Sequence, residues 1–87
     1  MTTHRLTLYG TEGCHLCDEA EWLLHQTQGS TVALEKVDIA EQALLLERYG
    51  IRIPVLRDTV SGHELNWPFD ASGILEFLSV CRPDPSP

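Results

Sequence analysis

The fold of this chain is decided by the stretch Leu6-Thr-Leu-Tyr-Gly-Thr-Glu-Gly-Cys14-His-Leu-Cys17-Asp-Glu-Ala-Glu-Trp-Leu-Leu24. It opens with four β-forming residues and then reaches Gly10 and Gly13, which is typical of a short strand and a turn. After the turn, apolar residues recur at helical spacing, at Leu16, Ala20, Leu23 and Leu24. The stretch therefore predicts a strand that leads into a helix, with two cysteines in the first helical turn.

Cys14 and Cys17 form a C-x-x-C motif at this junction. A thiolate is the nucleophile in thiol–disulfide exchange, and the free amides and dipole of a helix N-terminus favour it. Residues three apart on a helix lie together, so Cys17 can resolve a mixed disulfide formed at Cys14. Glu12 and Asp18 oppose the thiolate, whereas a protonated His15 would favour it. The motif predicts a redox pair; ordinary cysteines, or two ligands of a zinc or iron–sulfur site, are the other interpretations.

Length and charge restrict the organisation of the chain. Its 87 residues have room for one domain, which we place at residues 1–82, with residues 83–87 as a flexible tail. Thirteen acidic and six basic residues give a net charge of −7, which argues against nucleic acid and anionic membranes as partners. The first residues contain no apolar signal core, no apolar run reaches membrane-spanning length, and three cysteines do not make an extracellular disulfide framework. We therefore expect a cytoplasmic protein.

The periodicity of the whole chain predicts an α/β fold with the order β-α-β-α-β-β-α. Strands are expected at residues 4–9, 31–37, 51–58 and 63–66, and helices at residues 14–25, 38–49 and 71–81. Joined through a helix, the first two strands should lie parallel, while the last two form an antiparallel hairpin, so the four-stranded sheet is mixed. Asp38 and Asp70 are candidate N-caps. The expected apolar faces contain Ile39, Ala43, Leu44, Leu46 and Tyr49 in the second helix and Ile74, Leu75, Phe77 and Leu78 in the third.

Three further motifs accompany the cysteine pair. Leu8-Tyr9 precedes it, Ile53-Pro54 precedes the hairpin, and Trp67-Pro68-Phe69-Asp70 precedes the last helix. In this combination, from His4 to Cys81, the chain resembles the small bacterial glutaredoxin-like domain proteins of the thioredoxin-fold superfamily. The resemblance implies a thioredoxin-like fold of four strands and three helices.

The same resemblance implies a thiol–disulfide oxidoreductase in which Cys14 attacks and Cys17 resolves. It also implies a cis peptide bond at Pro54 and an extended backbone pairing between Ile53 and a bound thiol peptide. The substrates would be protein disulfides or low-molecular-weight thiols, and an external thiol reductant would restore the dithiol. No cofactor is required, because the cysteine pair carries the electrons, and by analogy the domain acts as a monomer.

Three more residues are candidates for substrate binding: His15, Trp67 and Asp70. Asp70 is expected first as a helix cap and second as a contact to the amino group of a ligand. Cys81, at the end of the last helix, is expected to be a packed, small apolar residue.

The chain departs from better-known glutaredoxins where those proteins bind glutathione. They carry a basic residue before the first cysteine, Pro-Tyr within the motif and Gly-Gly before an aspartate. At these places the present sequence has Thr11-Glu12-Gly13, His15-Leu16 and Asn66-Trp67-Pro68-Phe69. Glutathione is anionic, and its carboxylates would need cations or free amides. Arg48 and Arg52 are the only cations expected near the groove in which glutathione would bind. Glutathione dependence is therefore open, and a non-catalytic domain that binds proteins through the edge at Ile53-Pro54 is a further interpretation.

Overall fold

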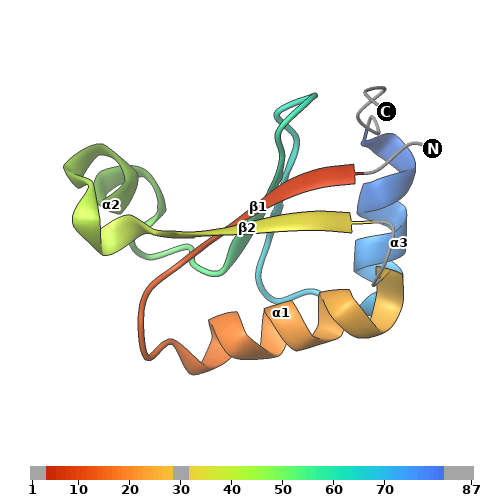
Figure 1. Ribbon diagram of the computed structural model, residues 1–87, viewed down its shortest axis with the longest axis horizontal. Helices are drawn as coiled ribbons and strands as arrows, with labels where there is room; N and C mark the ends of the chain where they lie inside the picture. Colours follow the sequence, from red (N-terminus) through yellow and green to blue (C-terminus); the bar gives the residue numbers. More distant parts are fainter. Residues whose placement is uncertain (1–3, 29–31, 82–87) are drawn as a thin grey trace.

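The protein folds as one mixed four-stranded sheet flanked by helices (Figure 1). The structure, a computed structural model, describes residues 4–28 and 32–81. The predicted tail at residues 83–87 lies outside these residues, as do residues 29–31 of the first loop. The strand order is β2-β1-β3-β4, with β1 at His4–Gly10, β2 at Val32–Asp38, β3 at Val55–Asp58 and β4 at Glu64–Asn66. The predicted fold class is confirmed.

The two predicted strand pairings are present, and a further pairing between β1 and β3 connects the two halves of the sheet. β1 pairs in parallel with β2 and antiparallel with β3, and β3 forms the hairpin with β4. Tyr9 on β1 lies opposite Val55 on β3. Val55 directly follows Pro54, so the Ile53–Pro54 segment leads into β3 near the end of β1, which is followed by the turn before the first helix.

The two faces of the sheet carry separate apolar clusters, because successive side chains of a strand point to opposite faces. On one face, α1 (His15–Gln28) and α3 (Ala71–Val80) pack against the sheet. Its buried residues are Leu6, Leu8, Ala20, Leu24, Leu56, Ile74, Phe77, Leu78 and Cys81. On the other face, the buried residues are Tyr9, Ile39, Tyr49 and Val55. Burial of a large apolar side chain stabilises the fold by about 1.5–3 kcal/mol. Leu24, with Ala20 and the partly buried Leu23, therefore holds α1 against the sheet.

The predicted second helix, residues 38–49, is divided in the structure. A single 3-10 turn, η2 (Ile39–Glu41), precedes α2 (Ala43–Tyr49), and Gln42 between them is extended, with φ of −133°. Asp38 caps η2 rather than α2, because its carboxylate accepts a hydrogen bond from the Ala40 N–H at 2.9 Å. The predicted apolar face was also wrong at Ala43, which is exposed, and at Leu44 and Leu46, which are 80% and 49% exposed.

Other boundaries differ by a few residues. α1 extends to Gln28 rather than ending near His25. β3 begins only at Val55, because the N–H groups of Arg52 and Ile53 both donate to the Tyr49 carbonyl and hold the preceding residues in a turn. Leu75, predicted to face the core, is 49% exposed. Within the described residues, no helix combines the length and apolar composition that crossing a membrane requires.

Candidate functional site

Cys14 and Cys17 lie at the N-terminus of α1. A tight turn precedes the helix, with the Cys14 N–H donating to the Thr11 carbonyl at 3.3 Å. Gly13 occupies the third position of this turn with φ of 78°, a conformation that glycine adopts without strain. Cys14 is then the N-cap residue, and its sulfur accepts a hydrogen bond from the Cys17 N–H at 3.1 Å. The two cysteines form a disulfide across the first turn, with Cα atoms 5.2 Å apart.

The two sulfurs differ in accessibility. Cys17 is only 8% exposed, whereas Cys14 is partly exposed at the start of the helix. Cys17 can sit this deep because it packs against Gly10: a Cβ atom at Gly10 would stand 2.7 Å from the Cys17 sulfur. An external disulfide therefore reaches Cys14 more readily than Cys17.

The Ile53–Pro54 peptide bond is cis, as the resemblance implies. It directly precedes Val55, which lies opposite Tyr9 near the end of β1. The Pro54 carbonyl accepts a hydrogen bond from the Trp67 N–H at 3.2 Å, which ties the segment before α3 to this loop. The Ile53 N–H donates to the Tyr49 carbonyl at 3.2 Å. Of the two backbone groups of Ile53, the N–H is therefore occupied, and the carbonyl is left for a bound peptide. The extended pairing of Ile53 with a thiol peptide stays a prediction.

A groove of about 660 Å³ brings two of the predicted binding residues together. It runs along α1 and is lined by His15, Asp18, Glu19, Trp22, Leu23 and Trp67. Asp70 does not line this groove. Its carboxylate caps α3 by accepting a hydrogen bond from the Gly73 N–H at 2.7 Å. The cap predicted from the sequence is confirmed, and the ligand contact stays a prediction.

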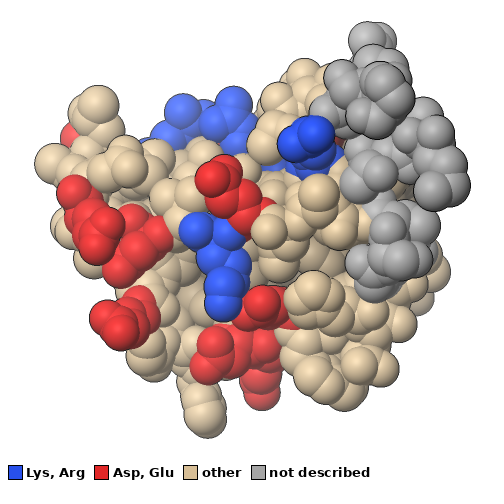
Figure 2. Space-filling view, viewed as in Figure 1, with Lys and Arg blue, Asp and Glu red and all other residues tan. Residues whose placement is uncertain are grey.

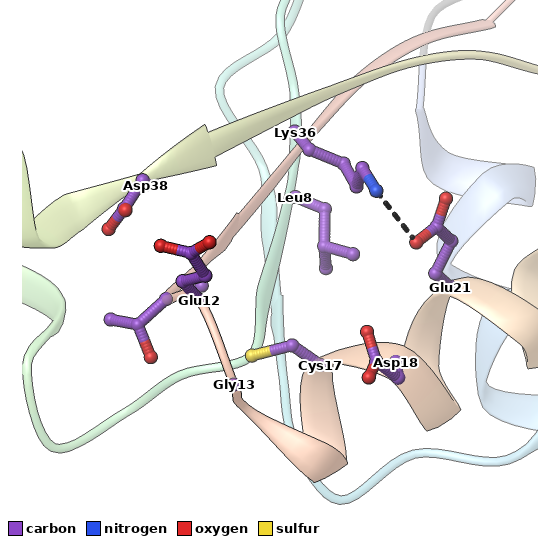
Figure 3. A pocket seen from close by; sticks show the side chains of 10 residues that line it. Leu8, Glu12, Gly13, Cys17, Asp18, Glu21, Lys36 and Asp38 are labelled. Carbon is purple, nitrogen blue, oxygen red and sulfur yellow. Dashed lines mark hydrogen bonds and ion pairs between the residues drawn. The ribbon is translucent and has the colours of Figure 1, made fainter.

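A smaller cavity of about 320 Å³ lies between α1 and β2, and Cys17 lines it (Figure 3). Carboxylates from three segments surround it: Glu12 from the turn, Asp18 and Glu21 from α1, and Asp38 from β2. Lys36 on β2 points across the cavity and pairs with Glu21 at 3.2 Å. This ion pair was not predicted from the sequence, where its one signal is that Lys36 is the only lysine in the chain. The cysteine pair thus lies in a predominantly acidic environment.

Comparison with known proteins places this arrangement in a family. The model of the glutaredoxin-like domain (DUF836) matches residues 5–79. The chain belongs to the glutaredoxin-like domain family.

Solved structures agree with this assignment. The X-ray structure of protein XcR50 from X. campestris is 44% identical, with a TM-score of 0.79, over 88% of this chain and 99% of that one. The solution structure of XcR50 is 42% identical, with a TM-score of 0.78, over 97% and 100% of the two chains. The solution structure of protein Ne2328 from Nitrosomonas europaea is 30% identical, with a TM-score of 0.70, over 88% and 93%. No curated protein matches the chain.

Arg48 and Arg52 of this glutaredoxin-like domain, the cations expected near a glutathione-binding groove, do not line the groove along α1 and instead interact with Glu64. The Arg52 guanidinium donates to Glu64 at 2.9 Å, Tyr49 donates to the other carboxylate oxygen at 2.5 Å, and Arg48 lies 4.0 Å from it. Burial alone would raise the pKa of Glu64, but the hydrogen bonds from Tyr49 and Arg52 outweigh burial and hold it below its usual value. Both guanidinium carbons also lie over the Tyr49 ring, 5.4 Å (Arg48) and 5.2 Å (Arg52) from its centroid. Their charge is therefore largely satisfied within the domain.

Cys81 of the glutaredoxin-like domain is a third and separate cysteine. It is unpaired and only 7% exposed within the core beneath α3. Burial, followed by the neighbouring Asp58 carboxylate, raises the pKa of the Cys81 thiol to about 12. The prediction of a packed cysteine is confirmed, and Cys81 remains a thiol near neutral pH.

Proposed function

We propose that this glutaredoxin-like domain is a thiol–disulfide oxidoreductase that uses Cys14 as the nucleophile and Cys17 as the resolving cysteine. The observation that carries the proposal is the unequal placement of the two sulfurs in one helical turn. Cys14 is partly exposed at the N-terminus of α1, and Cys17 lies behind it against Gly10, within disulfide distance.

The local hydrogen bonding suits a nucleophile at Cys14. A sulfur that accepts an N–H hydrogen bond is stabilised as the anion, and here the Cys17 N–H already donates to it at 3.1 Å. The dipole of α1 adds to this effect, because Cys14 lies at its positive end. The nearby carboxylates of Glu12 and Asp18 act in the opposite direction.

The reaction needs two exchanges. The Cys14 thiolate attacks one sulfur of a substrate disulfide, and the other sulfur leaves as a thiolate that takes a proton from water. Cys17 then attacks the Cys14 sulfur, which releases the second substrate thiol and leaves the Cys14–Cys17 disulfide. Two electrons pass from the protein dithiol to the substrate. An external thiol reductant, for which glutathione is one candidate, returns the pair to the dithiol, and no bound cofactor is required.

The residues beside Cys14 would bind the substrate. The Ile53 carbonyl of the cis Ile53–Pro54 bond would accept a hydrogen bond from the backbone of an incoming peptide. His15, which follows Cys14 in the sequence, and Trp67 line the groove along α1. Asp70 has its carboxylate occupied by the α3 cap, so a ligand amino group would share it with the Gly73 N–H.

The test is a redox titration in buffers of reduced and oxidised glutathione, with mass spectrometry to identify each state. We expect a reversible two-electron couple in the wild-type protein and a mixed disulfide on Cys14 in Cys17→Ser. Cys14→Ser is the matched control and should trap no adduct at position 17. The proposal fails if the wild-type protein forms no reversible disulfide.

The same preparations test the other interpretations. Within residues 4–28 and 32–81, no group of three or more His, Cys, Asp and Glu side chains is arranged to hold a metal ion. A zinc or iron–sulfur site at Cys14 and Cys17 would therefore need ligands from a second molecule, and stoichiometric zinc or a visible absorption band would reveal it. If the domain only binds partners, Cys14→Ser would retain partner binding and lose nothing else.

A further inference from the structure

The groove along α1 starts next to the nucleophile and has an apolar floor. His15, at one end of it, directly follows Cys14, so a protein segment disulfide-bonded to Cys14 places its neighbouring residues in the groove. Trp22 is 64% exposed there, although burial of an indole ring is strongly favourable, and Leu23 and Trp67 continue the apolar surface. With about 660 Å³, the groove holds several side chains.

The charged residues of this groove all have the same sign. Asp18 and Glu19 line it, and its lining contains no lysine or arginine. On the face shown in Figure 2, acidic side chains gather on the left and lower parts, basic groups lie along the upper edge, and acidic and basic side chains lie next to each other near the centre. Arg48 and Arg52, which could otherwise attract an anion, are paired with Glu64. The local field therefore favours a cationic partner over an anionic one.

We propose that this groove selects protein disulfides in which the attacked cysteine has an apolar residue and a lysine or arginine beside it. The inference rests on the redox function proposed above and specifies its substrate class. The cation of the substrate pairs with Asp18 and Glu19, and the apolar side chain packs on Trp22 and Trp67. Oxidised glutathione carries several carboxylates, so the acidic groove should make it react more slowly than a cationic protein disulfide.

The size of the effect follows from the exposure of these groups. Exposed ion pairs are individually weak and are screened by salt. Two of them together change a second-order rate constant by about three- to tenfold at low ionic strength. The preference should therefore be measurable, moderate and sensitive to salt.

The test uses two disulfide-linked peptide dimers that are identical except beside the cysteine. One peptide carries Leu-Cys-Arg and the other Leu-Cys-Glu, and each dimer is symmetric, so attack on either sulfur is equivalent. Reduced protein is mixed with each dimer, and quenched samples are analysed by mass spectrometry. Each turnover converts one peptide disulfide into two thiols and the Cys14–Cys17 dithiol into its disulfide.

We expect the arginine peptide to be reduced about three- to tenfold faster at low salt, with the ratio falling towards one in 0.5 M salt. The double variant Asp18→Asn/Glu19→Gln should bring the ratio close to one at low salt. Glu41→Gln/Glu47→Gln removes the same charge from η2 and α2, outside the groove, and should keep the ratio. Trp22→Ala should slow both peptides about threefold or more, whereas Leu44→Ala, at an exposed leucine of α2, should not.

Three results would overturn the inference. Equal rates for the two peptides at low salt, or a ratio that survives Asp18→Asn/Glu19→Gln, would show that the groove does not select charge while leaving the redox function intact. Sedimentation as a dimer that Trp22→Ala dissociates would show that a second copy covers the groove. No reduction of either peptide by protein confirmed as the dithiol would instead remove the proposed function itself, and this inference with it.

Discussion

The sulfur of Cys17 and the backbone of Gly10 are so close that no side chain fits between them. A Cβ atom at position 10 would stand 2.7 Å from the Cys17 sulfur and 3.2 Å from its Cβ. Glycine at the end of β1 therefore allows α1 to bring the resolving cysteine beneath the strand.

We expect Gly10→Ala to destabilise the reduced protein by about 1–3 kcal/mol, because the added methyl group overpacks this contact. The free energy of unfolding in urea gives the cost. In a double-mutant cycle with Cys17→Ala, the penalty should shrink, since the clashing sulfur is gone. Gly13→Ala is the control: the site is open but φ is 78°, so it should cost about 1–2 kcal/mol without coupling to Cys17. Additive effects of Gly10→Ala and Cys17→Ala would contradict this explanation.

The strand–helix junction was predictable because its signals are local. The change of periodicity at Gly13 and the cysteine spacing place the pair in the first turn of α1, and the structure agrees. The close approach of Gly10 to Cys17 was not predictable, because it depends on how deeply α1 packs under β1. The Lys36–Glu21 pair was missed for the same reason: it joins β2 to α1 across a cavity.

The second helix shows where periodicity misleads. Ile39 and Tyr49 are both completely buried in the cluster on the far face of the sheet, whereas Leu44 and Leu46 between them are exposed. The extended Gln42 interrupts the helix, so one helical period does not run from Ile39 to Tyr49. A sequence with leucine at three consecutive positions fits more than one helical register, and only the tertiary packing selects one.

Removing the carboxylate of Asp70 should weaken α3. Its oxygen accepts a hydrogen bond from the Gly73 N–H at 2.7 Å, and loss of such a cap costs about 0.5–2 kcal/mol. Asp70→Ala should lower the free energy of unfolding by this amount, while Asp70→Ser, which also caps helices, should retain most of it. If Asp70 also contacts a ligand amino group, Asp70→Ser would raise the KM for that substrate despite normal stability. Equal stability of the alanine and serine variants would contradict the capping role.

Glu64 should make the domain less stable in acid. Its pKa is lower in the folded protein than in the unfolded chain, where it lies near 4.5, so its stabilising contribution is present above that pH and is lost as the pH falls below it. Glu64→Gln should lower stability at pH 7 by about 1.5–3 kcal/mol, the range for hydrogen bonds to charged groups, and should flatten the acid limb. Urea unfolding between pH 3 and 7 measures both, with Glu47→Gln as the exposed charge control. An unchanged acid limb in Glu64→Gln would show that other carboxylates control it.

Cys81 should resist alkylation under conditions in which Cys14 reacts. Burial, with the Asp58 carboxylate second, raises the pKa of the Cys81 thiol to about 12, and only the thiolate is an effective nucleophile. Iodoacetamide treatment of the reduced native protein at pH 8 should therefore label Cys14 first and leave Cys81 unmodified, whereas unfolding in guanidinium chloride should expose all three cysteines. Peptide mass spectrometry distinguishes the positions. Native labelling of Cys81 as fast as Cys14 would mean that the end of α3 opens readily and that its core packing is weaker than the buried thiol indicates.

The buried Cys81 thiol should also make the domain less stable at high pH. The folded protein keeps the Cys81 proton above pH 9 while the unfolded chain loses it, so the free energy of unfolding should fall as the pH rises beyond 9, and less so in Cys81→Ala.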